Sequence, residues 1–163
     1  MSLHRPILLI IAVLTLLIAM PAHAAAPLAG RVVHVSDGDT VVVLTSGREE
    51  VKIRLHGIDC PEAKQPFGQA AKRQTLALAG RKEVTVIPMD TDRYGRTVGE
   101  VLLPDGTSLN KTLVATGYAW WYQKYAPRDA ELAALEAEAR RQRRGLWADS
   151  NPIPPWEWRK LQR

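Results

Sequence analysis

The chain has 163 residues, a formal net charge of +5 with neutral histidines, and a single cysteine, Cys60. This composition argues against a collagen-like chain, a disordered tail and a membrane protein. With one cysteine, neither an intrachain disulfide nor a cysteine-rich zinc site can form, and the thiol is either free or paired between chains. The modest positive charge favours an acidic partner such as nucleic acid, although unrelated secreted proteins are often basic too.

The N-terminus has the layout of a secretory signal peptide. Basic residues open residues 1–24, an apolar run covers residues 7–20, and small residues lead up to Ala24. The run is too short for a comfortable membrane span, and no second one follows. We therefore expect cleavage after Ala24, export to the periplasm or the extracellular space, and no stable membrane association afterwards. The alternative is an uncleaved N-terminal anchor. Cleavage leaves 163 − 24 = 139 residues, one domain of ordinary size.

Three strands are predicted first, over residues 30–36, 40–44 and 49–56. Asp-Gly and Ser-Gly pairs separate them, so we expect an antiparallel meander with short turns. In the third strand apolar residues alternate with basic ones. One face of that strand is therefore expected in the core, while the other carries Arg54 outward.

The rest of the chain predicts helices and two more strands. The helices are expected over residues 68–79, over residues 108–116 and from Asp129 toward Gly145, and the strands over residues 83–88 and 98–103. Ser108 and Asp129 are suitable N-caps. Glycines follow the helices, as is common at helix C-termini.

The order of these elements favours a mainly β fold with α-helices. Five short strands with an inserted helix suit a closed five-stranded barrel of the OB type, with three helices packed at one end. An open α+β sheet would show the same pattern. We place this domain at residues 25–150 and expect the Pro- and Trp-rich tail, residues 151–163, to be irregular.

Four groups of charged residues stand out against the predicted strands. They are Asp37 to Thr40 in the first turn, Arg54 in the third strand, Asp59 and Glu62 just after it, and Arg93 and Arg96 in the loop before the fifth strand. Each group alone has a simpler explanation as a turn, a solvated strand face or a surface loop. Together they supply carboxylates for a hard cation, two arginines for a phosphate and a carboxylate that activates water. These are the parts needed to hydrolyse a phosphodiester.

Four segments resemble the thermonuclease (staphylococcal nuclease) family. They are VSDGDTVVV, IRLHGIDCPE, DRYGR and, more weakly, RRQRRGLW, and they cover nearly all of residues 30–147 in order and spacing. The resemblance implies a five-stranded OB barrel with three helices and a secreted nuclease that requires Ca2+. It also implies that DNA and RNA are both substrates and that cleavage leaves the phosphate on the 3′ side.

The resemblance further implies a role for each matching residue. The carboxylates of Asp39 and Asp59 and the backbone carbonyl of Cys60 would hold the calcium ion. Glu62 would be the general base that activates the attacking water. The remaining matches are Arg54 and Arg96, which would hold the scissile phosphate, and Tyr94 and Tyr125, which would lie near the bound nucleotide.

Two departures from the family pattern affect substrate contact. A short stretch, residues 63–67, replaces a longer lysine-rich loop, and Gln123 stands at the position of a second tyrosine. Trp120, Trp121 and Tyr122 lie close by in the sequence. They would either stack on bases or pack against the barrel.

The leading hypothesis is a calcium-dependent endonuclease acting on DNA and RNA, which we expect to be a monomer. The alternative is a non-catalytic OB module that binds single-stranded nucleic acid, since one fold hosts many functions. Binding of another acidic polymer is a third interpretation. The joint presence of Asp39, Asp59 and Glu62 disfavours pure binding, because carboxylates repel a phosphate unless a cation lies between them.

Overall fold

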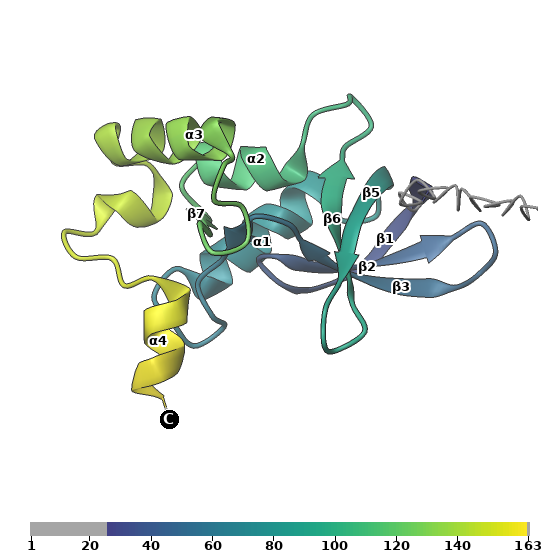
Figure 1. Ribbon diagram of the computed structural model, residues 1–163, viewed down its shortest axis with the longest axis horizontal. Helices are drawn as coiled ribbons and strands as arrows, with labels where there is room; N and C mark the ends of the chain where they lie inside the picture. The colour runs from purple at the N-terminus through teal and green to yellow at the C-terminus, as the bar shows by residue number, and fades with distance from the viewer. Residues whose placement is uncertain (1–25, 163) are drawn as a thin grey trace, which may run out of the picture.

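Five strands close into a barrel in the order β1-β2-β3-β6-β5, in a computed structural model that describes residues 26–162 (Figure 1). The strands are β1 (Leu28–Asp37), β2 (Thr40–Thr45), β3 (Glu50–Leu55), β5 (Glu83–Thr91) and β6 (Thr97–Leu102). β3 and β6 run parallel, and the other neighbouring strands are antiparallel. The expected OB-type barrel is confirmed, and the open-sheet alternative is wrong. The expected signal peptide, residues 1–24, lies outside the described residues.

Alternation of side chains explains why the strands close around one core. Val41, Val43 and Ile53 are fully buried, and so are the barrel residues Val86 and Val101 on the opposite strands. β-branched residues of this kind fit a pleated surface that is buried on one side. Burial of an aliphatic side chain contributes about 1.5–3 kcal/mol each, so this core provides most of the barrel's stability.

A second, two-stranded sheet lies outside the barrel. β4 (Ile58–Asp59) pairs antiparallel with β7 (Trp120–Trp121), and Asp59 is opposite Trp120. The sequence analysis did not predict this sheet, because two-residue strands carry no periodicity. It ties the chain just after β3 to the segment that follows the second helix, and so sets the position of Asp59.

In the described part of the chain, four α-helices accompany the barrel, one more than predicted. They are α1 (Gly68–Ala79), α2 (Leu109–Ala115), α3 (Ala130–Arg141) and α4 (Pro155–Leu161), with a short 3-10 helix η1 (Gly145–Ala148) between the last two. The predicted N-caps are confirmed: the side chains of Ser108 and Asp129 accept hydrogen bonds from backbone N–H groups of the first turns of α2 and α3. Between residues 26 and 162, no helix is long and apolar enough to cross a membrane.

The expectation of an irregular tail was wrong, because residues 155–161 form α4. A helix of this length is marginal in isolation, so tertiary packing must support it. Trp156 supplies that packing: its ring stacks on Tyr122 at a centroid distance of 4.9 Å and meets Trp120 edge-on at 5.6 Å. Figure 1 shows α4 set apart from the other helices, at the end of the chain.

Candidate active site

Arg54, near the C-terminal end of β3, is the centre of the candidate site. Its side chain is only 15% exposed, because its guanidinium contacts Asp39 at 3.1 Å and Asp59 at 2.9 Å. The pairing of β2 with β3 sets Thr40 opposite Arg54, which brings the preceding Asp39 within reach. Arg54 lies on the face of β3 away from the buried Ile53 and Leu55, as the alternation predicted, but carboxylates rather than solvent surround its guanidinium.

The turn between β1 and β2 presents Asp39 from the other side. One carboxylate oxygen of Asp39 accepts a hydrogen bond from the Thr40 hydroxyl at 3.2 Å, and the other accepts one from the backbone N–H of Cys60 at 2.7 Å. The side chain of Asp37 accepts from the N–H of Asp39 at 3.2 Å, which fits its predicted role as a turn residue. A Cβ atom at Gly38 would lie 2.7 Å from the Cβ of Cys60, so only glycine fits there.

Burial and neighbouring charge perturb the ionisable groups of this site. Burial raises the pKa of Asp59 to about 6, against the lowering effect of its hydrogen bond to Arg159. Burial and the nearby carboxylate of Asp39 raise the pKa of Asp37 to about 6. Burial opposes the charge of Arg54, but Asp39 and Asp59 outweigh it and raise the pKa of the guanidinium. Such clustering of perturbed groups is typical of functional sites.

Glu62 joins the site through a residue that the sequence analysis did not single out. Arg159 of α4 contacts Glu62 at 2.6 Å and Asp59 at 2.7 Å, so one guanidinium bridges the two carboxylates. Glu62 itself is partly exposed, and its side chain is 42% accessible. The proposed base therefore lies at the edge of the site, on the side open to solvent.

Arg96 reaches the site from the loop between β5 and β6. Its Nη1 donates to the Thr40 hydroxyl at 3.5 Å, and its Nε donates to Asp92 at 2.7 Å. Asp92 also accepts hydrogen bonds from the backbone N–H groups of Tyr94 and Arg96. β5 extends to Thr91, past its predicted end at residue 88, which leaves a tight turn that Asp92 closes.

Of the two tyrosines predicted to lie near the nucleotide, Tyr94 lies beside a site arginine and Tyr125 lies away from the site carboxylates. Tyr94 is 68% exposed, and the guanidinium of Arg96 lies 5.6 Å from its ring centroid. Tyr125 is 60% exposed and contacts Tyr122, but it has no hydrogen bond or ion pair to the carboxylates. Trp120 is buried, as expected for a packing role, while Trp121 and Tyr122 are half-buried.

The donor chemistry of the site fits a hard cation. Asp39 and Asp59 are buried carboxylates that approach one guanidinium, and the backbone of Cys60 is bonded to Asp39. Calcium prefers oxygen ligands of this kind. Within residues 26–162, however, no three His, Cys, Asp or Glu side chains already converge on one point. Arg159 stands between Asp59 and Glu62.

Comparison of the sequence with known proteins identifies the family of this chain. A model of the family described as staphylococcal nuclease homologue matches residues 52–149. An "Uncharacterized endonuclease" of Escherichia coli O157:H7 is 48% identical over 130 residues, which covers 80% of this chain and 84% of the relative. The chain belongs to the staphylococcal nuclease family. A "Micrococcal nuclease" of Shigella flexneri is 41% identical over 161 residues, covering 93% of this chain and 91% of the relative. A "Staphylococcal-like nuclease CAN1" of Arabidopsis thaliana is 45% identical over 115 residues, covering 71% of this chain and 35% of the relative.

In this staphylococcal nuclease homologue, sequence reasoning missed two residues of the site. Asp92 orients Arg96, and an aspartate four residues before the arginine in DTDRYGR was a local signal that could have indicated it. Arg159 had no such signal, because its partners Glu62 and Asp59 lie 97 and 100 positions earlier in the sequence.

Proposed function

We propose that the protein is an exported endonuclease that hydrolyses phosphodiester bonds of DNA and RNA and depends on Ca2+. One observation carries the proposal: Asp39 and Asp59 both contact Arg54, and Asp59 and Glu62 both contact Arg159, so these carboxylates and arginines form one network of charges. Two of the relatives are named as an endonuclease and a nuclease, which supports the same class of reaction.

In this mechanism Glu62 takes the proton from the attacking water, because its carboxylate is the partly exposed acid of the site. Arg54 and Arg96 would bind the scissile phosphate and stabilise its additional negative charge, since a guanidinium matches phosphate oxygens in a bidentate way. Asp39, Asp59 and the carbonyl of Cys60 would hold the cation. When bound, calcium supplies a positive charge that polarises the phosphate.

The experiment uses the chain from Ala25 onward with single-stranded DNA, double-stranded DNA and RNA. We expect degradation with Ca2+ and none with a chelator. Glu62→Gln should lower the turnover by roughly 10²–10⁴-fold, because general-base catalysis contributes about this much. Glu50→Gln is the matched control: Glu50 is exposed at the start of β3, so its turnover should be unchanged.

Other results would contradict the proposal. Near-native turnover in Glu62→Gln would show that Glu62 is not the base. Intact substrates with every metal, together with a salt-sensitive gel shift, would favour the non-catalytic module that binds single-stranded nucleic acid.

A further inference from the structure

We propose that α4 inhibits the candidate active site from within the chain: Arg159 competes with a divalent cation for Asp59 and Glu62 and must leave them before the cation binds. This inference rests on the proposed metal-dependent function and adds a regulatory element to it. It concerns the segment after residue 149, where the family match ends.

The guanidinium of Arg159 binds the carboxylates that would otherwise face the metal ion. Nη2 donates to one oxygen of Asp59 at 2.7 Å, and Nη1 donates to the other at 3.3 Å. The same Nη1 donates to Glu62 at 2.6 Å. One guanidinium therefore occupies both oxygens of the proposed metal ligand and one oxygen of the proposed base. Charge-assisted hydrogen bonds of this kind are about twice as strong as neutral ones.

Charge balance explains why the chain holds an arginine there. Asp39, Asp59 and Glu62 bring three negative charges when ionised, and Arg54 offsets one of them. Arg159 offsets a second. A divalent cation at the same carboxylates would supply this positive charge itself, so the cation and Arg159 would repel each other at close range. The cation and Arg159 therefore compete for the carboxylate of Asp59.

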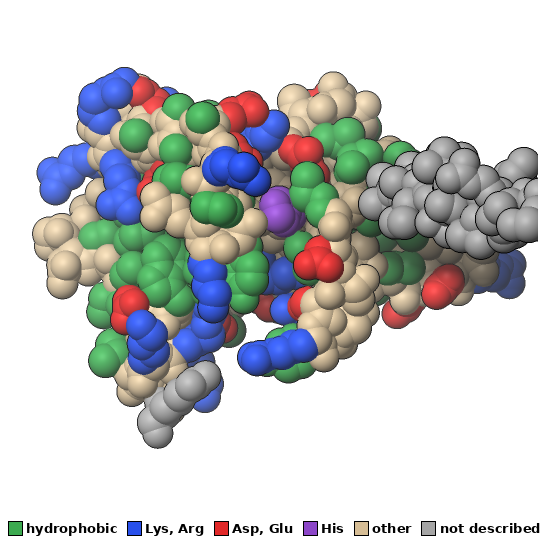
Figure 2. Space-filling view, in the orientation of Figure 1, with side chains coloured by type: hydrophobic (Ala, Val, Ile, Leu, Met, Phe, Trp, Pro, Cys, Tyr) green, Lys and Arg blue, Asp and Glu red, His purple; other side chains and the backbone are tan. Residues whose placement is uncertain are grey.

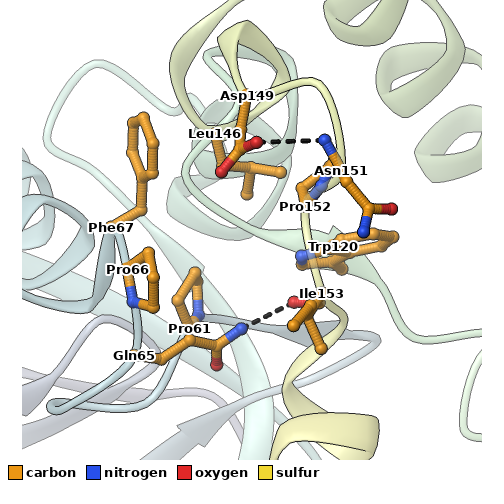
Figure 3. Close-up of a pocket in the computed structure, with 10 residues that line it drawn as sticks. All are labelled: Pro61, Gln65, Pro66, Phe67, Trp120, Leu146, Asp149, Asn151, Pro152 and Ile153. Carbon is orange, nitrogen blue, oxygen red and sulfur yellow. Dashed lines mark hydrogen bonds between the residues drawn. The ribbon is translucent and has the colours of Figure 1, made fainter.

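The attachment of α4 is weak enough to be released. Pro155–Leu161 is a short helix, and the side chain of Arg159 is 40% exposed to solvent. The segment that precedes α4 is held by Gln65, whose side-chain amide donates to the carbonyl of Ile153 at 2.6 Å (Figure 3). Because Ile153 precedes α4, this bond would keep the segment near the site after the helix has moved.

The ring of Trp156 is a further attachment of α4. It packs on Tyr122 and Trp120 and lines a groove of about 510 Å³ that Arg140 and Lys160 also border. Figure 2 shows hydrophobic side chains gathered between α3 and α4 with basic side chains around them. Among the hydrogen bonds of residues 26–162, those to the carboxylates of Asp59 and Glu62 come from Arg54 and Arg159 and not from the Trp156 ring, so its removal should loosen α4 while the carboxylates stay in place.

The test is the affinity for Ca2+, measured by titration calorimetry on the chain from Ala25 onward. Arg159→Gln should bind Ca2+ about tenfold tighter or more, because the ion no longer displaces a charge-assisted pair. Lys160→Gln is the matched control: it removes the same charge from the same helix, but among residues 26–162 Lys160 pairs only with Glu157. Its affinity should stay within about twofold of the starting chain, as expected for an exposed pair. Trp156→Ala should also bind Ca2+ tighter.

Hydrogen exchange provides a second readout that does not depend on activity. Adding Ca2+ to the starting chain should speed exchange of the backbone amides of residues 155–161, because α4 leaves the site. Equal or weaker Ca2+ binding by Arg159→Gln and Trp156→Ala, or unchanged exchange in α4, would overturn the inference while Ca2+-dependent cleavage still stands. If neither the starting chain nor Arg159→Gln binds Ca2+, both the inference and the proposed metal-dependent function are wrong.

Discussion

Asn110 shows at the residue scale how a buried polar side chain joins separate elements. Its side-chain oxygen accepts from the N–H of Val101 at 3.1 Å, and its amide donates to the carbonyls of His56 and Gly99 at 3.0 and 3.2 Å. The residue is 3% exposed. It links α2 to β6 and to the end of β3, directly behind the strand that carries Arg54.

Asn110→Ala should lower the free energy of unfolding by about 2–4 kcal/mol, because the N–H of Val101 and the carbonyl of His56 lose their side-chain partner. The carbonyl of Gly99 loses one of its two donors and keeps the N–H of His56 at 2.8 Å. Urea denaturation of the chain from Ala25 onward measures the loss. Asn151→Ala is the control: Asn151 is exposed, and its side chain makes none of the hydrogen bonds found in the described part of the chain. Its effect should stay within about 0.5 kcal/mol. Equal effects of the two substitutions would contradict this role for Asn110.

Asp92 positions Arg96, and its charge gives a pH signature. Slight burial acts to raise the pKa of Asp92, but hydrogen bonds from Arg96 and Tyr94 outweigh it and lower the pKa below its usual range. A lowered folded-state pKa means that the ionised carboxylate stabilises the fold. This stabilisation is complete above the unfolded value of about 3.9 and is lost as the pH falls through the folded value.

Asp92→Ala should therefore lower both the stability at neutral pH and the turnover, because Arg96 loses its orientation. The stability difference from the starting chain should shrink as the pH falls below about 3.9. Urea denaturation at several pH values measures it, and Asp90→Ala, an exposed neighbour, serves as the control. A difference that persists unchanged at low pH would show that the charge of Asp92 does not matter.

At the scale of the elements, α3 depends on its first turn and on its last. Asp129 accepts a hydrogen bond from the N–H of Leu132 at 2.9 Å. At the other end Arg140 places its guanidinium 3.9 Å from the ring centroid of Trp147 and pairs with Glu136. This arginine is thus occupied by packing and by an ion pair.

Asp129→Ala should destabilise the protein by about 1 kcal/mol, since an N-cap side chain contributes roughly this much. The helix should survive, because Leu132 and Ala139 remain packed against the rest of the fold. Urea denaturation gives the free energy, and far-ultraviolet circular dichroism monitors the helix content. Arg128→Ala, at an exposed position just before the cap, should have almost no effect.

For the whole molecule, the single cysteine means that no intrachain disulfide supports the fold. Cys60 is 4% exposed, packed between the first turn and α1, and burial raises the pKa of its thiol. Of the two fates left open by the sequence, burial of the thiol favours a free cysteine over pairing between chains. A buried, protonated thiol is a poor nucleophile.

A thiol reagent at neutral pH should therefore label the native chain slowly and label it fully after unfolding in urea. Reducing agent should leave the melting temperature unchanged. Non-reducing electrophoresis should show a single species of monomer size. Rapid labelling of the native protein, or a disulfide-linked dimer, would mean that Cys60 is accessible.

The local pattern of the sequence determined the five barrel strands, the first three helices and the two N-caps. These features depend on neighbouring residues: alternation defines a strand face, and a polar side chain at the start of a helix satisfies its own first turn. The residues that carry the candidate chemistry were also visible, because Asp39, Asp59 and Glu62 stand in short recognisable segments.

Only the tertiary structure decided how these groups meet. Arg54 alternates like a solvent-facing residue, yet carboxylates from two turns enclose it. α4 has too little periodicity to predict, and it forms because Trp156 finds partners on another part of the chain. The pairing of Arg159 with Asp59 and Glu62 spans most of the domain. Such ion pairs depend on distances in space, which the path of the whole chain sets and no local pattern encodes.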